Sequence, residues 1–223
     1  MASRARKEIK PAPPLLPAEL EATTIERAAV ESGGEWAGVA LEDDDLAELA
    51  APGLRFEESR LVRVDLSASW LAQLSLSDLQ LESCNLANAQ VRGGSLWRAV
   101  VSRSRLTGLF WNEGMLRDVV LRDCRIDLAS FGTTRLEQVV FERCLLTQTE
   151  FQEAKLRSVR FVDCDLTEAD LTLAQFTECE MRGCTLDGVR AAERLNGVAM
   201  PWPDVLGLAG TMADALGIRV LAD

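Results

Sequence analysis

A stretch of twenty residues near the C-terminal end of the chain gathers side chains that could carry out chemistry. The sequence FVDCDLTEADLTLAQFTECE, residues 161–180, holds six carboxylates, two cysteines and no basic residue. Paired carboxylates can serve general acid–base catalysis, and carboxylates with thiolates can hold a metal ion. The same acids could instead form a surface for a cationic partner, and that candidate surface consists of Asp163, Asp165, Glu168, Asp170, Glu178 and Glu180.

The chain lacks the residue types that most often assist such chemistry. The 223 residues include no histidine and no tyrosine, so the usual general base near neutral pH and the commonest metal ligand are missing. The sequence also contains no P-loop, no G-x-S-x-G and no G-x-G-x-x-G motif. We therefore expect a protein that is not an enzyme and that has no cofactor and no metal site.

The charge of the chain points to cationic partners. The formal net charge is −11, which disfavours a nucleic acid as the ligand and favours a partner with positive charge. No apolar run approaches the length of a membrane span. Prolines follow the basic start MASRARKEIK, where a signal peptide would need an apolar region. We expect a cytoplasmic protein that binds neither a membrane nor nucleic acid directly.

A pentad repeat organises most of the chain. Every fifth residue from Phe56 to Leu186 is large and apolar, without exception over 27 positions. Of the 27 residues that stand two places earlier, 23 are Ala, Cys, Gly, Ser, Thr or Val, and neither column contains a charge. A period of five fits neither a helix nor a simple strand. It requires a chain that turns a corner once in every pentad, so that four pentads close a square coil and stacked coils form a solenoid.

This pentad resembles the motif of the pentapeptide-repeat family, roughly A-(D/N)-L-x-x. The segments CNLAN (84–88), CDLTE (164–168) and ADLTL (169–173) match it closely, and the register holds without a slip from Phe56 to Leu186. The resemblance implies an all-β solenoid, a right-handed quadrilateral β-helix of about seven coils with an N-terminal cap and a short C-terminal helix. With coils about 4.8 Å apart, such a rod is about 32 Å long.

The six cysteines all fall in the column of small inward residues. We interpret them as small, polarizable core residues. Stacked thiols that point in parallel disfavour disulfides, and the lack of a C-x-x-C pair disfavours a metal site. Five of the cysteines are separated by whole coils of four pentads and would form a core ladder on one side of the rod: Cys84, Cys124, Cys144, Cys164 and Cys184.

The N-terminal flank divides into two expected parts. Residues 1–35 are expected to be a flexible Pro/Ala-rich tail, in which KPAPPLLPAEL is an extended linker or, alternatively, a docking peptide for a partner. Residues 36–55 are expected to cap the open end of the solenoid. Because Asp44 would point inward if the pentad continued, we predict an edge strand over WAGVAL and a short helix over DDDLAELA, with Asp43 or Asp44 near its N-cap.

The repeat occupies residues 56–190 and is followed by a C-terminal element, residues 191–223. Pro203 and Asp204 suit the start of a helix and Gly217 suits its end. This helix could simply cover the last coil. The family resemblance implies instead an elongated two-fold homodimer formed through C-terminal elements, with candidate contacts at Trp202, Val205, Leu206, Leu208, Ala209, Met212 and Leu216.

The resemblance also suggests a function. The best-understood bacterial members, of the MfpA and Qnr types, resemble B-form DNA in width, length and negative charge, bind DNA gyrase in place of DNA and protect it from quinolones or natural poisons. The resemblance therefore implies a DNA mimic that modulates a topoisomerase. The alternative is a rigid protein–protein interaction scaffold with no role at a topoisomerase.

The distribution of charge along the chain is uneven. Residues 1–55 carry −5, residues 56–190 carry −4 and the remainder carries −2. A uniform DNA mimic should not contain a basic region, yet four arginines follow one another without an intervening acid. They form a candidate basic patch, which is either a binding face or an ordinary solvated face: Arg92, Arg98, Arg103 and Arg105.

Overall fold

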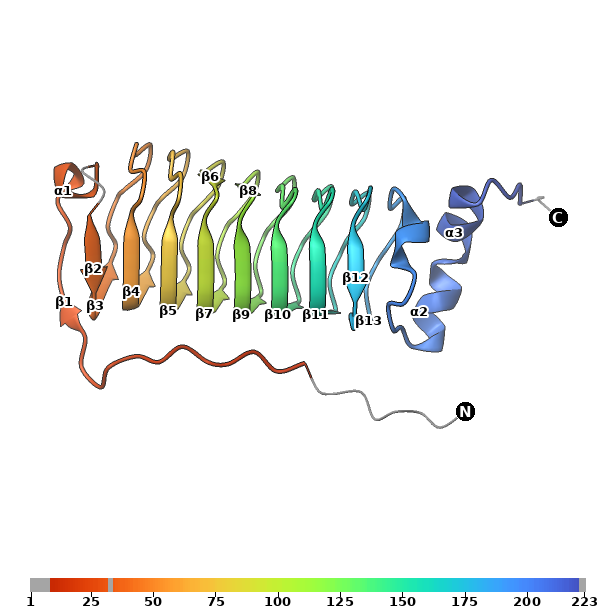
Figure 1. The fold of residues 1–223 in the computed structure, drawn as a ribbon, viewed down its shortest axis with the longest axis horizontal. Helices are drawn as coiled ribbons and strands as arrows, with labels where there is room; N and C mark the ends of the chain where they lie inside the picture. The colour runs from red at the N-terminus through yellow and green to blue at the C-terminus, as the bar shows by residue number, and fades with distance from the viewer. Residues whose placement is uncertain (1–8, 32–33, 221–223) are drawn as a thin grey trace.

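The chain forms a parallel β-solenoid of about eight turns in the computed structural model, which describes residues 9–31 and 34–220 (Figure 1). This confirms the predicted fold class. Six strands of eight residues each stack along the rod, and each bends around one corner: β4 (Arg55–Val62), β5 (Ser75–Glu82), β7 (Ser95–Ser102), β9 (Met115–Arg122), β10 (Arg135–Glu142) and β11 (Lys155–Val162). Shorter strands complete the coils: β2 (Glu35–Ala37), β3 (Val39–Glu42), β6 (Gln90–Arg92), β8 (Phe110–Asn112), β12 (Gln175–Thr177) and β13 (Glu180–Arg182).

The register between neighbouring coils is four pentads in every strand pair of the repeat. Leu116 of β9 is aligned with Leu136 of β10, which is aligned with Leu156 of β11, and all these pairs are parallel. Because the shift is a whole number of pentads, each large inward side chain stacks on the large inward side chain of the next coil.

The chain turns its corners through left-handed backbone. The second residue after each large inward residue has positive φ, for example 54° at Asp78 and 67° at Gly108. Most of these residues are not glycine, and the left-handed conformation costs a non-glycine residue about 1–2 kcal/mol. Hydrogen bonds between coils offset this cost: the amide of Asp123, a corner residue with a φ of 55°, donates to the Glu142 carbonyl over 3.0 Å. The corner is thus stable only when another coil lies beside it.

The core is a continuous column of stacked apolar side chains. All the large inward residues from Phe56 to Leu186 are buried except Phe176, which is half-buried. Phenylalanines in the C-terminal half stack in pairs, with ring centroids 5.6 Å apart for Phe131 and Phe151. For Phe141 and Phe161 the centroid distance is 4.9 Å. Burial of this column is the main apolar contribution to the stability of the rod.

The solenoid begins one coil earlier than the sequence indicated. Residues 35–53 continue the pentad, and Trp36 stacks on Phe56 with ring centroids 5.4 Å apart. The helix predicted over DDDLAELA is wrong, because the backbone turns corners at Asp43 (φ 61°) and Glu48 (φ 56°) as it does elsewhere in the repeat. Asp44 does point inward, against the assumption that excluded this arrangement.

The end of the solenoid is covered by residues that the sequence placed in the tail. Strand β1 (Glu21–Ala22) pairs in parallel with β3, and helix α1 (Arg27–Glu31) follows it. Val30 of α1 is fully buried, and Ile25 packs on the core. This short unit pairs with the strand edge of the first coil and covers its apolar end, as a cap must.

The opposite end carries a 3₁₀ turn η1 (Ala192–Leu195) and two short helices, α2 (Trp202–Gly207) and α3 (Ala209–Ala215) (Figure 1). The sequence predicted one helix here. Instead the two helices meet at Leu208, whose φ and ψ are −78° and −9° and whose side chain is buried. Pro203 lies in the first turn of α2, and Gly217 follows α3 with positive φ, in agreement with the predicted start and end.

Asp44 provides a test of this arrangement at the N-terminal end. Its Oδ2 is buried without a hydrogen-bond partner among the described residues. Desolvation raises the pKa of Asp44 above its ordinary value, although a hydrogen bond with the Ile25 backbone opposes the rise. An acid whose pKa is higher in the folded than in the unfolded state lowers stability as the pH rises through the interval between the two values.

We therefore expect Asp44→Asn to raise the melting temperature at pH 7. The gain should shrink as the pH falls below the ordinary pKa of an aspartate, because Asp44 is then neutral in both states. Thermal unfolding followed by circular dichroism across this pH range measures the effect, with the exposed Asp45→Asn as the matched control. A gain that is absent, or equal at all pH values, would contradict an inward carboxylate.

Candidate interaction surfaces

The six carboxylates of residues 161–180 surround the rod and do not gather into one patch. The coil turns corners at Asp163, Glu168 and Glu178, which all have positive φ, so successive acids point from different sides. The result is a ring of acids one coil high near the C-terminal end. We call it the acidic belt, made of Asp163, Asp165, Glu168, Asp170, Glu178 and Glu180.

Most acids of the belt are hydrogen-bonded to the coil beside them or to their own corner. Glu168 Oε2 accepts a hydrogen bond from the Gln148 side chain over 2.7 Å. Asp165 Oδ1 accepts from the backbone amide of Thr167 over 3.0 Å and from its hydroxyl. The remaining pairs are Glu178 with Ser158 and Glu180 with Arg182. These bonds orient the acids, and two of the six also pair with an arginine: Glu180 with Arg182 and Asp170 with Arg190.

Asp170 is the buried member of the belt. It accepts hydrogen bonds from the Thr172 amide over 2.9 Å and from the Gln152 side chain over 2.8 Å, and it lies 3.0 Å from Arg190. Burial alone would raise the pKa of Asp170, but the bonds with Thr172 and Gln152 outweigh burial and hold the pKa below its ordinary value. Asp170 is therefore ionised at neutral pH, and its carboxylate holds together Thr172, Gln152 and Arg190 around the corner.

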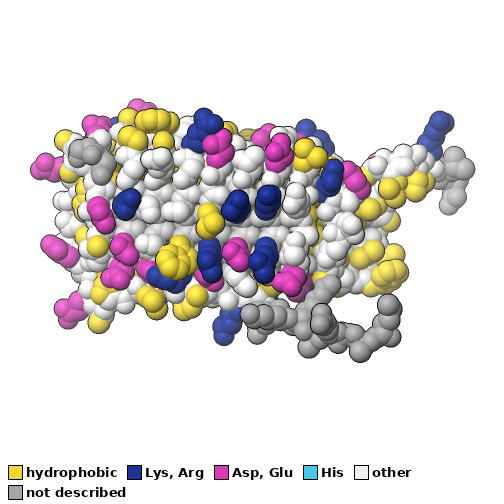
Figure 2. Space-filling model, viewed as in Figure 1, with side chains coloured by type: hydrophobic (Ala, Val, Ile, Leu, Met, Phe, Trp, Pro, Cys, Tyr) yellow, Lys and Arg dark blue, Asp and Glu magenta, His cyan; other side chains and the backbone are white. Residues whose placement is uncertain are grey.

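Three arginines of the basic patch pair with acids one coil away. Arg92 contacts Glu113 over 2.7 Å, and Arg103 forms an ion pair with Glu82. On the face of the rod shown in Figure 2, acidic and basic side chains are interspersed. A local window of sequence could not reveal this, because the partners stand about one whole coil apart in the chain. Arg105 is exposed and is the member of the patch for which the described residues provide no ion pair.

Arg98 forms the most buried of these pairs. Its Nε lies 2.6 Å from Asp78 Oδ1, and the Asp78 side chain is 3% exposed. The Arg98 guanidinium also lies 3.8 Å above the ring of Trp97, a cation–π contact. The bonds from Arg98 hold the pKa of Asp78 below its ordinary value, against the effect of burial. Arg98 is thus part of the structure and is not free to bind a partner.

The cysteine ladder lies where the sequence placed it and is chemically quiet. All six cysteines are free thiols, and all but Cys184 are buried. The thiol of Cys144 donates to the Leu121 carbonyl over 3.4 Å. The neighbouring Cys124 thiol, with burial, raises the pKa of Cys144 to about 12. The hydrogen bond with Cys144 lowers the pKa of the buried Cys124 thiol instead. Cys144 stays protonated, which makes it a poor nucleophile and a poor metal ligand, and the described residues contain no cluster of acids and thiols able to hold a metal ion.

Comparison with family models decides the classification. The model described as "Pentapeptide repeats (8 copies)" matches residues 59–98, and the model described as "Pentapeptide repeat region" matches residues 95–171 and 115–191. Together these matches cover residues 59–191, more than half of the chain. The chain is a pentapeptide-repeat protein.

Comparison with solved structures finds matches at low sequence identity. HetL from the cyanobacterium Nostoc sp. strain PCC 7120, involved in heterocyst differentiation regulation, is 17% identical, with 75% of this chain and 90% of HetL covered and a TM-score of 0.43. Full-length QnrB1, a plasmid-mediated fluoroquinolone resistance protein, is 18% identical, with 83% and 100% covered and a TM-score of 0.41. Rfr23 from the cyanobacterium Cyanothece 51142 is 15% identical, with 70% and 89% covered and a TM-score of 0.25. No curated protein matches the chain.

The C-terminal helices of this pentapeptide-repeat protein expose an apolar surface. Leu208 is buried and Met212 packs on the core, so these two candidate dimer contacts face the rod. The carboxylate of Asp204 fixes α2 by accepting a hydrogen bond from the Gly183 amide over 2.7 Å. The remaining candidate contacts point to solvent, among them Trp202, which is 71% exposed, and also Val205, Leu206, Ala209 and Leu216.

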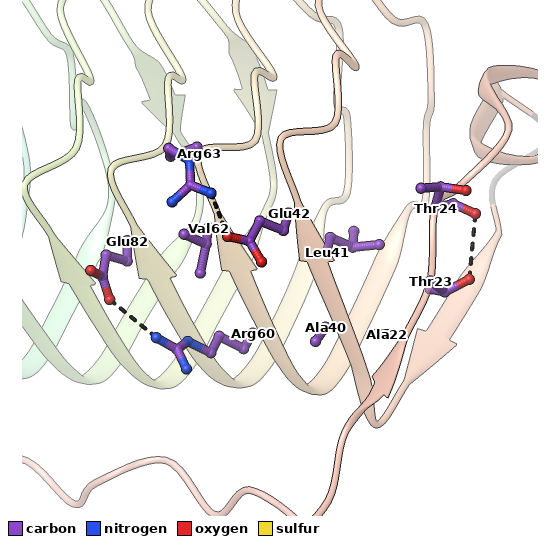
Figure 3. A pocket seen from close by; sticks show the side chains of 10 residues that line it. All are labelled: Ala22, Thr23, Thr24, Ala40, Leu41, Glu42, Arg60, Val62, Arg63 and Glu82. Carbon is purple, nitrogen blue, oxygen red and sulfur yellow. Dashed lines mark hydrogen bonds and ion pairs between the residues drawn. The ribbon is translucent and has the colours of Figure 1, made fainter.

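A shallow pocket lies beside the N-terminal cap, between β1 and strands β3 to β5 (Figure 3). Its charged side chains are already paired: Arg63 contacts Glu42, and Arg60 lies 3.5 Å from Glu82. Thr23 and Thr24 line the pocket on the side of the cap (Figure 3). The described lining contains no activated nucleophile and no unpaired cation, so the pocket offers neither a reaction nor an anion site.

Two acids outside every predicted site hold the N-terminal segment against the rod. Asp78 and Asp118 accept hydrogen bonds from the backbone amides of Leu15 and Ala12. The sequence assigned residues 1–35 to a flexible tail, but residues 9–17 lie extended along the solenoid. The contact could not be predicted, because the two acids belong to different coils. No helix in the described part of the chain is long and apolar enough to cross a membrane.

The difference in exposure between two ion pairs generates a prediction. We expect Arg98→Ala to lower the melting temperature by several degrees, because it leaves the buried Asp78 carboxylate without its cation. Arg92→Ala should have little effect, since the side chains of Arg92 and Glu113 are 70% and 52% exposed and water screens the pair. Equal melting temperatures of the two variants would show that Arg98 is an ordinary surface residue.

Proposed function

We propose that this pentapeptide-repeat protein works without catalysis, as an acidic homodimeric rod that binds the cationic groove of a DNA-binding protein. DNA gyrase or a related topoisomerase is the partner that fits this chemistry. The observation that carries the proposal is the acidic belt, which concentrates six carboxylates in one coil of a chain with net charge −11. A groove that normally holds phosphates attracts such a ring of fixed negative charge.

Pairing through the C-terminal helices is the second part of the proposal. Large apolar side chains crowd the end of the rod at α2 and α3, where Trp202, Leu206 and Leu216 are exposed. Exposed apolar clusters of this kind are typical of protein–protein contacts. A two-fold contact at this end would bury them, and it would bring the two acidic belts together near the centre of a longer rod.

The middle of the rod limits how far the likeness to DNA extends. Residues 96–115 contain three arginines and one acid, and residues 116–135 contain four arginines and three acids, so this region is net positive. Duplex DNA carries one negative charge about every 1.7 Å of its axis. We therefore assign the partner contact to the paired acidic belts at the centre of the dimer and not to the whole length of the rod.

A second candidate function is a general protein–protein scaffold. Aromatic side chains on the sides of the rod favour it: Trp70, Trp97 and Phe110 are all exposed at outward positions. Tryptophan and phenylalanine are enriched at protein interfaces, and a rigid array of coils presents them in fixed positions. A scaffold would bind its partner through these residues without any effect on a topoisomerase.

The dimer gives the first prediction. Leu206→Asp should convert a dimer into a monomer, because a charge in the centre of an apolar contact is left desolvated and unpaired. Light scattering coupled to size-exclusion chromatography measures the mass of the intact chain. Leu128→Asp is the matched control, since Leu128 is equally exposed, at 57% against 59%, but lies on the side of the rod. A monomeric wild-type chain at high concentration removes the proposed pairing.

The topoisomerase contact gives the second prediction. The wild-type protein should inhibit DNA supercoiling by gyrase, or restore it in the presence of a fluoroquinolone or a natural-product poison. A belt variant with Asp165→Asn, Glu168→Gln and Glu178→Gln should lose most of this effect, because it removes three carboxylates that pair with no arginine among the described residues. The control removes three charges elsewhere on the rod, with Glu113→Gln, Asp123→Asn and Glu137→Gln.

The two candidate functions predict different results in this assay. Loss of effect in the belt variant alone supports the topoisomerase contact. An equal loss of the effect on supercoiling in both variants would mean that gyrase recognises the net charge of the rod and not the belt. A wild-type dimer that neither inhibits nor rescues supercoiling would leave the scaffold as the function.

A further inference from the structure

The N-terminal segment, residues 9–17, lies along the outward face of strands β5 to β11 as a single extended strand that belongs to no sheet. It runs back along the rod from the cap toward the C-terminal end (Figure 1). The backbone amide of Leu15 donates to Asp78 Oδ1 over 2.9 Å, and that of Ala12 donates to Asp118 Oδ1 over 3.0 Å. Both acids occupy the same corner of the solenoid, two coils apart.

The spacing of these two hydrogen bonds matches a polyproline II helix. Two coils of the rod span about 9.6 Å. Three residues of a polyproline II helix span about 9.3 Å and complete one turn, so every third amide points in the same direction. The sequence IKPAPPLLP of this segment is rich in the residue that favours this conformation. The solenoid therefore presents acceptors at the repeat distance of a proline-rich chain.

The burial of Ile9 fits the same spacing between the segment and the coils. Ile9 stands three residues before Ala12, and Ser158 stands two coils beyond Asp118 at the same corner. The same spacing therefore places Ile9 at the level of Ser158. Ile9 is 8% exposed and Ser158 is 8% exposed. Val140, an outward residue between these levels, is only 4% exposed. Ile9 and Val140 are both buried although they lie outside the main core cluster, so their burial comes from the surface of the rod and not from its interior.

The segment resembles a bound peptide more than an element of the fold. The inward residues of the strands beneath it, such as Leu79, Ala99 and Val119, are buried in the main core. Two of its hydrogen bonds go to side chains of the rod, and its outer side, including Lys10, Ala12 and Leu15, is exposed. Its removal would uncover a prepared surface without opening the core.

We propose that the outward face of strands β5 to β11 is a recognition surface for polyproline II segments, and that residues 9–17 occupy it as an internal ligand. The partner it fits is a proline-rich, extended segment of another protein, with a backbone amide at every third position and an apolar residue at the end nearest β11. Such a chain loses little conformational freedom on binding. The tethered segment competes at a high effective concentration, so it keeps weak ligands out.

The test uses the full chain with the internal ligand weakened. A tail variant carries Ile9→Ser, Pro11→Gly and Pro14→Gly, which change three of the four buried or half-buried residues of the segment and leave the rod unaltered. The probe is a fluorescein-labelled peptide with the sequence of residues 9–19, IKPAPPLLPAE, followed by fluorescence anisotropy. We expect the tail variant to bind the peptide roughly tenfold or more tighter than the wild-type chain, because the internal competitor is lost.

Two matched changes identify the recognition. A peptide with Ala12→Pro and Leu15→Pro keeps the polyproline II conformation but lacks both donors, and it should bind roughly tenfold or more weakly. In the tail variant, Asp78→Gly with Asp118→Gly removes the acceptors without backbone strain, since both positions have a φ of 54°. Asp123→Gly with Asp163→Gly, at other corners with positive φ, is the control and should bind the peptide normally.

Two results would overturn the proposal. One is a tail variant that binds the peptide no better than the wild-type chain does. The other is equal binding of the two peptides, which would mean that the rod does not recognise the backbone amides at every third position. Because the peptide comparison leaves the protein unchanged, it decides the question even if the Asp78→Gly change, which also removes the partner of Arg98, lowers stability.

Discussion

Hydrogen bonds between coils are the interaction on which the rest of this structure depends. In every pentad the backbone turns through a left-handed corner, which most side chains adopt at a cost. Along the rod, corner amides donate to carbonyls one coil away, as Asp163 does to Arg182 over 2.8 Å. The unfavourable free energy of the left-handed backbone is thus offset only when coils stack and form these hydrogen bonds. This explains why the register of four pentads is kept without a slip, and why neither end of the rod can be left uncovered.

The same register controls the surface. Side chains separated by one full coil stand directly beside one another, so an arginine that has no acid near it in the sequence can still be paired. Arg98 with Asp78 and Arg92 with Glu113 are examples. The net charge that a partner meets at any point of the rod therefore depends on the numbers of acids and arginines in two neighbouring coils. That balance is most acidic in the belt of residues 161–180 and positive near the middle of the rod.

The ends of the rod follow less regular rules. At the N-terminal end, β1 and α1 cover the first coil, and the inward Asp44 has a hydrogen bond with the backbone of Ile25, which lies between β1 and α1. At the C-terminal end, η1 and α2–α3 cover the last coil but expose Trp202 and Leu206. The chain before β1 turns back and lies on the outward side of the strands, so the surface of the rod includes part of its own N-terminus.

The pentad was sufficient to predict the solenoid, the inward columns and the cysteine ladder, because those features depend on a period that a single sequence displays in full. It was insufficient at residues 36–55, where one inward aspartate broke the pattern and led to a helix that does not exist. Tertiary structure decided the site: that Arg92, Arg98 and Arg103 meet Glu113, Asp78 and Glu82, and that Ala12 and Leu15 meet Asp118 and Asp78. Those contacts join residues at least one coil apart in the chain, and only the closing of the coils brings them within hydrogen-bonding distance.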